Sequence, residues 1–266
     1  MEYLFAALMG IIQGLTEFIP VSSTAHLRIL PELLGQKDLG AAFTAIIQIG
    51  TLFSLIIYFW KDVYKLLVDF SSSLIKKNFK NPNFLLSLYI IVGTIPIIIF
   101  GILFKRLIEN EFRSLLVVSL SLIIFAALLL ISEWIGKKEK GIENMNLKDA
   151  ILIGLAQAFA LIPGASRSGV TICMALFLGY KREISARFSF LMSIPSVLAA
   201  AIFEANEIFN SDLGYSIASV IIATLFSLVS GIIAIEFLLR FLVSHKINIF
   251  AYYRILLGTI ILIFFV

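Results

Sequence analysis

Long apolar runs separated by short polar connections make up most of the chain. Uncharged runs of about ~20 residues can cross a hydrocarbon core of ~30 Å as helices. Four runs meet this length, namely Ala41–Trp60, Phe84–Phe104, Ser114–Ser132 and Leu213–Ile235. Two further runs qualify with their flanks, since Phe188–Phe203 is shorter and Ile247–Val266 contains Arg254. We therefore predict six membrane crossings, at 41–60, 84–104, 114–134, 188–203, 213–239 and 247–266.

Two other apolar regions, Tyr3–Leu34 and Ala150–Tyr180, are interrupted near the middle by polar residues and a proline. Each half is about 10–17 residues long, which is too short to span a membrane alone. Non-helical backbone at membrane depth is tolerated only inside protein or beside a water-filled cavity. We therefore predict two re-entrant helical hairpins. The expected fold is an all-α polytopic membrane protein with six transmembrane helices plus these hairpins.

The composition supports a single integral membrane domain over residues 1–266. The chain is 60% apolar and 14% charged, with a mean hydropathy of +1.03, whereas soluble domains are ~45–50% apolar and ~25% charged. One cysteine, Cys173, excludes an internal disulfide, and two histidines exclude a site of three imidazoles. No basic residue precedes the first apolar stretch, so we do not expect a cleaved signal peptide.

The distribution of lysine and arginine predicts the orientation. Basic residues cluster on connections that would share one side, namely Lys61, Lys65, Lys76, Lys77, Lys80, Lys137, Lys138, Lys140, Lys148, Lys181, Arg182, Arg187, Arg240 and Lys246. Fewer lie on the other side, namely Arg28, Lys37, Lys105, Arg106 and Arg113, and the 204–212 connection carries only acidic charges. Positive residues favour the cytoplasmic side. The first hairpin should thus enter from outside and the second from inside, and the positive net charge does not indicate nucleic-acid binding.

The two hairpins resemble each other in sequence. Gly10-Ile-Ile-Gln13 matches Gly154-Leu-Ala-Gln157, and Ile19-Pro-Val-Ser-Ser23 matches Ile162-Pro-Gly-Ala-Ser166 with one residue dropped. An odd number of crossings separates the copies, so they should be inverted in the membrane. The halves would be approximately 1–135 and 150–266. Transporter folds with inverted repeats and broken helices place their sites near the bilayer midplane.

The first break gathers groups suited to acid–base chemistry. Gln13 and Glu17 are four residues apart and share one helical face. Pro20 ends that helix. It is followed by the hydroxyls of Ser22, Ser23 and Thr24 and then by the imidazole of His26. Ionisable groups inside a membrane are costly and usually functional. A purely structural acid and simple helix capping by the hydroxyl residues are the alternatives.

The second break is suited to anion binding. Arg167 lies in the sequence Pro163-Gly-Ala-Ser-Arg-Ser-Gly169. Backbone N–H groups of such a turn and the following helix N-terminus attract anions, and a guanidinium matches phosphate oxygens. The alternative is an Arg167–Glu17 pair that is only structural. Both breaks together favour phosphoryl transfer on an anionic, lipid-linked substrate.

These motifs resemble those of a known family. Gln13-Gly-Leu-Thr-Glu-Phe-Ile-Pro-Val-Ser-Ser-Thr-Ala-His26 and Pro163-Gly-Ala-Ser-Arg-Ser-Gly169 are similar to the two motifs of the bacterial undecaprenyl-diphosphate phosphatases, the bacitracin-resistance family. The likeness extends over nearly the whole chain. It implies hydrolysis of the C55 isoprenoid diphosphate to the monophosphate, which recycles the carrier lipid for peptidoglycan synthesis. It also implies a bacterial inner-membrane location, with the active site open to the outer side.

The resemblance assigns roles by motif position. Glu17 would be the metal-linked acid, Ser23 and His26 the nucleophile and acid–base pair, and Arg167 the diphosphate clamp. The diphosphate would also contact the polar groups of both breaks, namely Ser22, Thr24, Gly164, Ser166, Ser168 and Gly169. The cofactor would be a divalent cation, Mg²⁺ or Ca²⁺, held by Glu17 with Gln13 as a second candidate ligand. The expected partners are the polyprenyl diphosphate and membrane lipids, and a homodimer is left open.

Several alternatives stay open. We expect attack by Ser23 with His26 as its base, but attack by His26 itself or by a metal-bound water is compatible with the same residues. A lipid or anion transporter could use the same broken helices. The lipid-phosphate branch of the acid-phosphatase superfamily is disfavoured because His245 has no second histidine motif around it.

Overall fold

The computed structural model describes residues 2–36, 40–109, 112, 114–210 and 216–266, and its regular elements in these ranges are helices. Six long helices correspond to the predicted crossings. They are α3 (Gly40–Tyr58), α5 (Pro82–Leu103), α7 (Leu115–Ile135), α10 (Arg182–Asn210), α11 (Ile217–Ser244) and α12 (Asn248–Phe264). The polytopic, all-helical fold class is therefore confirmed.

Not every one of these helices meets the length and hydropathy of a membrane crossing. Four helical segments, in α5, α7, α10 and α11, are long and apolar enough to cross a membrane, and a bent pair of helices raises this to five. Helix α12 is apolar but has only 17 residues. The predicted count of six stays a prediction.

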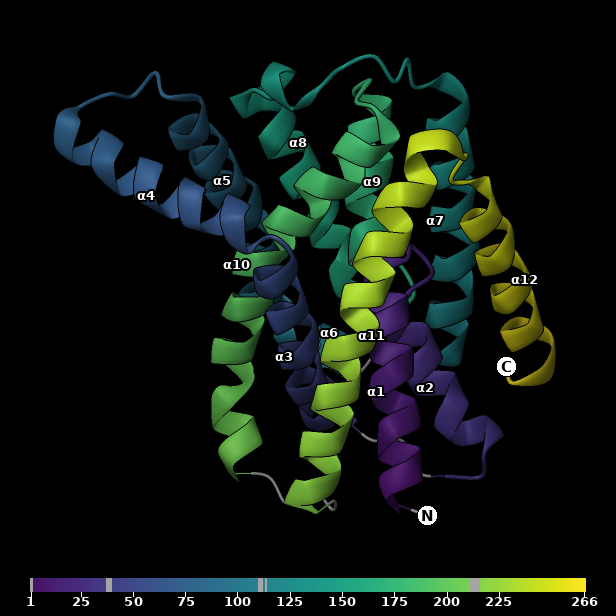
Figure 1. The fold of residues 1–266 in the computed structure, drawn as a ribbon. Coiled ribbons are helices and arrows are strands. Elements are labelled where there is room, and N and C mark those ends of the chain that lie inside the picture. The colour runs from purple at the N-terminus through teal and green to yellow at the C-terminus, as the bar shows by residue number, and fades with distance from the viewer. Residues whose placement is uncertain (1, 37–39, 110–111, 113, 211–215) are drawn as a thin grey trace.

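The two broken regions form helical hairpins (Figure 1). Helix α1 (Glu2–Phe18) runs from one end of the molecule to its middle, and α2 (Ser23–Leu33) returns toward the same end. Helices α8 (Leu147–Ala158) and α9 (Arg167–Phe177) do the same from the opposite end, with the short helix η3 (Phe159–Leu161) between them. The two breaks therefore meet in the interior.

Helix α4 (Trp60–Lys76) was missed by the sequence analysis, which treated these residues as a polar connection. It follows α3 at a bend of 78° and projects sideways from the bundle at the end where α8 begins (Figure 1). Its exposed apolar residues recur at helical spacing at Trp60, Tyr64, Leu67 and Ile75. A helix with such a stripe and flanking lysines is typical of a membrane interface.

Helix α1 packs most extensively on α11, and α8 packs in the same way on α5. Gly10 makes the first approach possible, because a Cβ there would lie 2.1 Å from the carbonyl oxygen of Ala223. Gly154, its predicted counterpart, similarly lies against Gly93 of α5. The outward faces instead carry large apolar side chains, as at Ile221 and Val229 of α11, which suits a lipid surround.

The described ends of the bundle agree with the charge asymmetry. Helix α4, the 137–148 connection, the start of α10 and the α11–α12 junction lie at one end, and α6 (Lys105–Glu109) lies toward the other (Figure 1). The short helix η2 (Ile142–Asn144) belongs to the first of these ends. Lys37, Arg113 and residues 211–215, which also entered the orientation argument, lie outside the described residues.

The local register of the two breaks differs from the predicted match by one residue. The N-cap of α2 is Ser22 and that of α9 is Ser166, so Ser166 corresponds to Ser22 and not to Ser23. This spacing equals that between Gly10 and Gly154, and no residue needs to be dropped. The match of Ile19 with Ile162 was wrong because it aligned Pro20 with Pro163, whereas the helix caps align Ser22 with Ser166. The equivalence of the complete halves stays a prediction.

Candidate active site

The first break places the polar residues of α1 and α2 next to each other. Gln13 and Glu17 lie on the buried face of the last turns of α1. Ser22 then caps α2, with its hydroxyl accepting from the Ala25 N–H at 3.4 Å. Its φ is +74° and its ψ 98°, a backbone conformation that is rarely adopted by non-glycine residues. This conformation turns the chain back so that Ser23, the first residue of α2, points at Glu17.

The second break has the same local design. Ser166, with a φ of +69°, caps α9 by accepting from the Gly169 N–H at 3.2 Å. Gly164 precedes it at a φ of +95°, and a Cβ there would lie 2.5 Å from the carbonyl oxygen of Val118. Only glycine suits a position with both constraints. Arg167 is the first residue of α9, in the position that Ser23 holds in α2.

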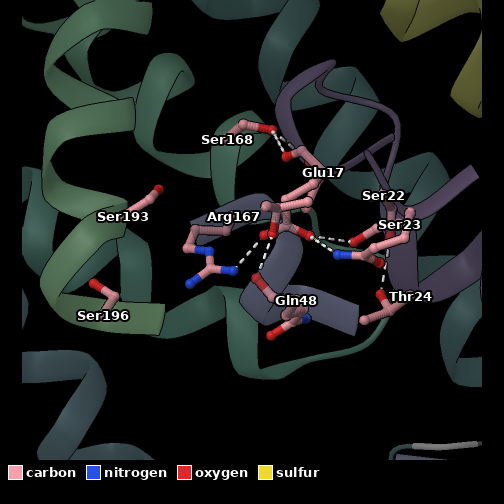
Figure 2. Close-up of polar contacts among 12 residues, drawn as sticks. Glu17, Ser22, Ser23, Thr24, Gln48, Arg167, Ser168, Ser193 and Ser196 are labelled. Carbon is pink, nitrogen blue, oxygen red and sulfur yellow. Dashed lines mark hydrogen bonds and ion pairs between the residues drawn. The ribbon is translucent and has the colours of Figure 1, made fainter. Parts of the chain in front are cut away.

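The two breaks are joined by direct contacts (Figure 2). The Gly164 N–H donates to the Thr24 hydroxyl at 3.3 Å, and the Ser168 hydroxyl donates to the Glu17 carbonyl at 3.2 Å. The Arg167 guanidinium forms an ion pair with the Glu17 carboxylate. The prediction that the breaks meet is thus confirmed in the structure. The predicted structural alternative, an Arg167–Glu17 pair, is also present as a contact.

Glu17 is the centre of the site. One carboxylate oxygen, Oε1, accepts from Arg167, and the other, Oε2, accepts from the Ser23 hydroxyl at 2.7 Å and from the Gln13 amide at 3.0 Å. The side chains of Arg167 and Glu17 are 14% and 7% exposed. An ion pair so shielded from water interacts more strongly than a surface pair. We call Gln13, Glu17, Ser23 and Arg167 the Glu17 cluster.

His26 lies outside this cluster, although the sequence analysis expected it to be the base for Ser23. Its Nδ1 is 2.8 Å from the Ser22 carbonyl oxygen, and its Nε2 is 2.6 Å from the Tyr253 hydroxyl of α12. The His26 and Tyr253 rings also stack, with centroids 5.6 Å apart. A carbonyl only accepts, so Nδ1 carries the proton and Nε2 accepts from Tyr253. In this structure the acceptor for the Ser23 hydroxyl is Glu17 Oε2 and not a ring nitrogen of His26.

A cavity of about 360 Å³ opens on the Glu17 cluster. The predicted site residues on its wall are Glu17, Ser22, Ser23, Thr24, Ser166 and Arg167. Gln13, His26, Gly164, Ser168 and Gly169 do not line it. The wall continues as an apolar surface between α5 and α10, which includes Ile98, Ile102, Ala199 and Phe203. An anionic head at the cluster with an apolar tail along this surface would fit such a cavity.

Other wall residues were not predicted as site residues. They include Gln48 of α3, Lys105 and Ser196. Lys105 lies 4.8 Å from the centroid of the Phe203 ring and places a positive charge toward the α6 end of the cavity. Its signal in the sequence is weak, since a lysine at a helix end is common in membrane proteins.

The oxygen atoms near Glu17 are suitable for a divalent cation only in part. Among the described residues, no three histidine, cysteine, aspartate or glutamate side chains come together as a metal site. However, Gln13 Oε1 is buried without a hydrogen-bond partner in the described structure, next to the Glu17 carboxylate. Mg²⁺ is often held by one or two carboxylates together with substrate phosphates and waters. The donor set therefore fits a cation shared with a phosphate substrate.

Comparison with known proteins finds relatives over nearly the whole chain. The family model described as "Bacitracin resistance protein BacA" matches residues 6–260. An undecaprenyl-diphosphatase of Chlorobium phaeobacteroides is 49% identical over 96% of this chain and 94% of its own length. Proteins of the same name from Chloroherpeton thalassium and Myxococcus xanthus are each 46% identical, over 98% and 99% of this chain and 96% and 89% of their own lengths.

Proposed function

The chain belongs to the bacitracin resistance protein BacA family, and we propose that the Glu17 cluster is where it hydrolyses undecaprenyl diphosphate to undecaprenyl phosphate and inorganic phosphate. The observation that carries this proposal is the shared carboxylate. Glu17 accepts from the Ser23 hydroxyl and pairs with Arg167 at the wall of one cavity. The Ser23 hydroxyl, the Glu17 carboxylate as a base and the Arg167 guanidinium as a phosphate-binding group are thus within reach of one substrate. The comparisons give no support to the transporter alternative.

Ser23 is the proposed nucleophile, and Glu17 is its base. A serine hydroxyl is weakly nucleophilic and needs an adjacent acceptor for its proton. Glu17 Oε2 is 2.7 Å from Ser23 Oγ. In the first step Ser23 Oγ bonds to the terminal phosphorus, its proton passes to Glu17, and the bridging P–O bond breaks with its electron pair leaving on undecaprenyl phosphate. Water then attacks the phosphoserine, Glu17 returns its proton to Ser23 Oγ, and inorganic phosphate departs.

Arg167 and the turn before it hold the terminal phosphate. In the free enzyme the guanidinium is neutralised by Glu17. A diphosphate can accept from the donors of Arg167 that Glu17 does not occupy, in the planar geometry that suits phosphate oxygens. The N-terminus of α9 adds favourable partial charge from the same direction. Catalysis of phosphoryl transfer consists mostly of such positioning and charge stabilisation.

The polyprenyl chain follows the apolar wall between α5 and α10. Ile98 and Ile102 of α5 face the cavity from one side, and Ala199 and Phe203 of α10 from the other. The prenyl chain arrives from the bilayer, which is as apolar as this wall, so these contacts position the chain by van der Waals packing and do not remove it from water. This wall favours long isoprenoid diphosphates over water-soluble phosphate esters.

A divalent cation, Mg²⁺ or Ca²⁺, is part of the proposal. Glu17 and Gln13 Oε1 would hold it together with substrate oxygens, and it would supply additional neutralisation of phosphate charge. Gln13 also donates to Glu17 and so orients the carboxylate that Ser23 uses.

The enzyme acts from a membrane, and we propose the bacterial inner membrane with the cavity open to its outer side. The cavity wall includes Lys105 and Ile108 of α6. The lysine-rich connections that we assign to the cytoplasm lie at the opposite end of the bundle (Figure 1). Product formed there returns the carrier lipid to cell-wall synthesis.

The decisive experiment combines turnover with trapping of the intermediate. Purified protein in detergent, given undecaprenyl diphosphate labelled in the terminal phosphate, should release labelled phosphate at steady state. An acid quench should leave a phosphoserine that peptide mapping places at Ser23, since phosphoserine survives acid and phosphohistidine does not. Ser23→Ala should release no phosphate above background and give no adduct. Substantial turnover by Ser23→Ala would exclude the serine mechanism.

A further inference from the structure

Arg254 of α12 is buried in an unusual way. It has 0% exposed surface and is the largest of the fully buried side chains. A guanidinium removed from water is costly unless its charge and donors are used. Among the described residues no carboxylate pairs with it, and its Nε and Nη1 have no hydrogen-bond partner. Such a residue needs an explanation beyond packing.

The contacts of Arg254 are with the backbone of the second break. Its Nη2 donates to the carbonyl oxygens of Gly164 and Ala165, at 3.0 and 2.9 Å. These two carbonyls precede Ser166 and Arg167 in the turn that faces the cavity. Because both carbonyl oxygens accept from Arg254, which does not line the cavity, they cannot rotate toward an anion on the cavity side.

The sequence of the turn also accommodates this guanidinium. A Cβ at Gly169 would lie 2.7 Å from Arg254 Nη1. The glycine that ends the Pro163–Gly169 motif therefore leaves room for a side chain 85 positions further along the chain. On the opposite side, Thr24 accepts from the Gly164 N–H at 3.3 Å. The turn is thus held between the first hairpin and α12.

We propose that Arg254 is a positioning residue that fixes the Arg167 turn in its anion-binding conformation and adds positive charge behind it. The inference rests on the proposed function, because the anion is taken to be the substrate diphosphate. Arg254 does not touch the substrate. Its two bonds keep carbonyl oxygens away from the phosphates, and its unpaired donors leave its charge uncompensated until an anion binds nearby.

The test compares Arg254→Met and Arg254→Lys with a matched control, Arg240→Met. Arg240 is 82% exposed and paired with Glu236 near the end of α11, a helix that contributes no residue to the cavity wall. We expect Arg254→Met to raise KM for undecaprenyl diphosphate about tenfold or more, a loss of the size expected for one charge-assisted hydrogen-bonded group. Arg254→Lys should recover part of this because an ammonium can still donate to both carbonyls. Arg240→Met should match the wild type.

A double-mutant cycle separates positioning from simple stability. Arg167→Lys should lower kcat/KM about 10²-fold in the wild-type background, as expected for loss of one transition-state donor. In the Arg254→Met background the same substitution should lower kcat/KM at most a few-fold, because the turn is no longer fixed. A merely structural role would instead lower the melting temperature and leave the two effects multiplicative. Multiplicative effects, or an unchanged KM in both Arg254 variants, would overturn the inference.

Inorganic diphosphate provides a measurement that does not depend on hydrolysis. It should raise the melting temperature of the wild type and of Arg240→Met, and this shift should be lost in Arg254→Met and smaller in Arg254→Lys. If the wild type fails to hydrolyse undecaprenyl diphosphate but shows this Arg254-dependent shift, the proposed function fails and the positioning role stands. An equal shift in all four proteins would refute the positioning role, whatever the activity.

Discussion

The two helix breaks share a backbone design but carry opposite chemistry. Ser22 and Ser166 are both N-caps with positive φ, of +74° and +69°, and each starts a helix of 11 residues. The residue that follows is Ser23 in one break and Arg167 in the other. The first break therefore supplies a hydroxyl near an acid, and the second supplies a guanidinium. The shared backbone provides the geometry, and the residue after each cap determines what that geometry does.

The positive φ of the two cap residues is a strained backbone conformation that destabilises both breaks. A non-glycine residue in a sparsely populated backbone region costs about 1–3 kcal/mol. Both caps persist because surrounding contacts fix them, namely His26 on the Ser22 carbonyl and Arg254 on the carbonyls before Ser166. Helix α12 supports each break, since Tyr253 holds His26 and Arg254 holds the second turn. The comparison thus identifies α12 as the common support.

The largest expected effect is the loss of Glu17, because its carboxylate serves both breaks. Glu17→Gln keeps the shape but removes the proton acceptor for Ser23 and the counter-charge of Arg167. We expect steady-state phosphate release to fall by about 10³-fold or more, since both general-base catalysis and charge positioning are lost. Gln13→Glu exchanges the amide that donates to Glu17 for a second carboxylate, and we expect it to retain activity in the presence of the divalent cation that neutralises the added charge. Near-normal turnover of Glu17→Gln would contradict the central role of this residue.

The next effect tests whether the second break needs a guanidinium or only a positive charge. Arg167→Lys keeps the charge but cannot present two parallel donors to a phosphate. We expect kcat/KM to fall by about 10²–10³-fold, the usual cost of one transition-state donor. A lysine variant within a few-fold of the wild type would show that Arg167 only balances Glu17.

Much of this arrangement could be predicted from the sequence, and the failures have specific causes. The hairpins followed from apolar runs interrupted at Pro20 and Pro163, and the Arg167–Glu17 contact had been considered as a purely structural pair. Helix α4 was missed because its lysines suggested a loop, although its apolar residues recur at helical spacing. An amphipathic pattern next to a span is typical of an interfacial helix.

The position of His26 could not be predicted from spacing alone. Ser23 and His26 are three residues apart in the first turn of α2, which places them on neighbouring faces. The choice of partner depends on Tyr253, more than 200 residues away, and only the tertiary structure brings that hydroxyl to Nε2. Arg254 is a similar case, since its position inside an apolar segment does not reveal what it contacts.

A smaller effect distinguishes a His26 that supports the Ser22 turn from a His26 that acts as the base for Ser23. His26 Nδ1 donates to the Ser22 carbonyl, and an asparagine amide can make a similar bond. We expect His26→Ala to lower kcat about tenfold through a displaced Ser23, which corresponds to loss of one hydrogen bond. His26→Asn should be more active than His26→Ala, with the pH profile of the wild type. Equal inactivity of both variants would instead return the general-base role to the imidazole.

The smallest effects test whether the two caps are equivalent. Alanine at position 22 or 166 loses the cap hydrogen bond, at about 1 kcal/mol, and keeps the Cβ at positive φ, a strain of roughly 1–2 kcal/mol that the native serine already bears. Glycine loses the same bond but accepts positive φ without this strain. Melting temperatures in detergent should therefore place Gly above Ala, and level with or above Ser, at both positions. Ser114 provides the control, because it caps α7 at an ordinary φ of −65°. There alanine and glycine should lie close together, and the same closeness at 22 and 166 would show that backbone strain does not distinguish the two breaks from other caps.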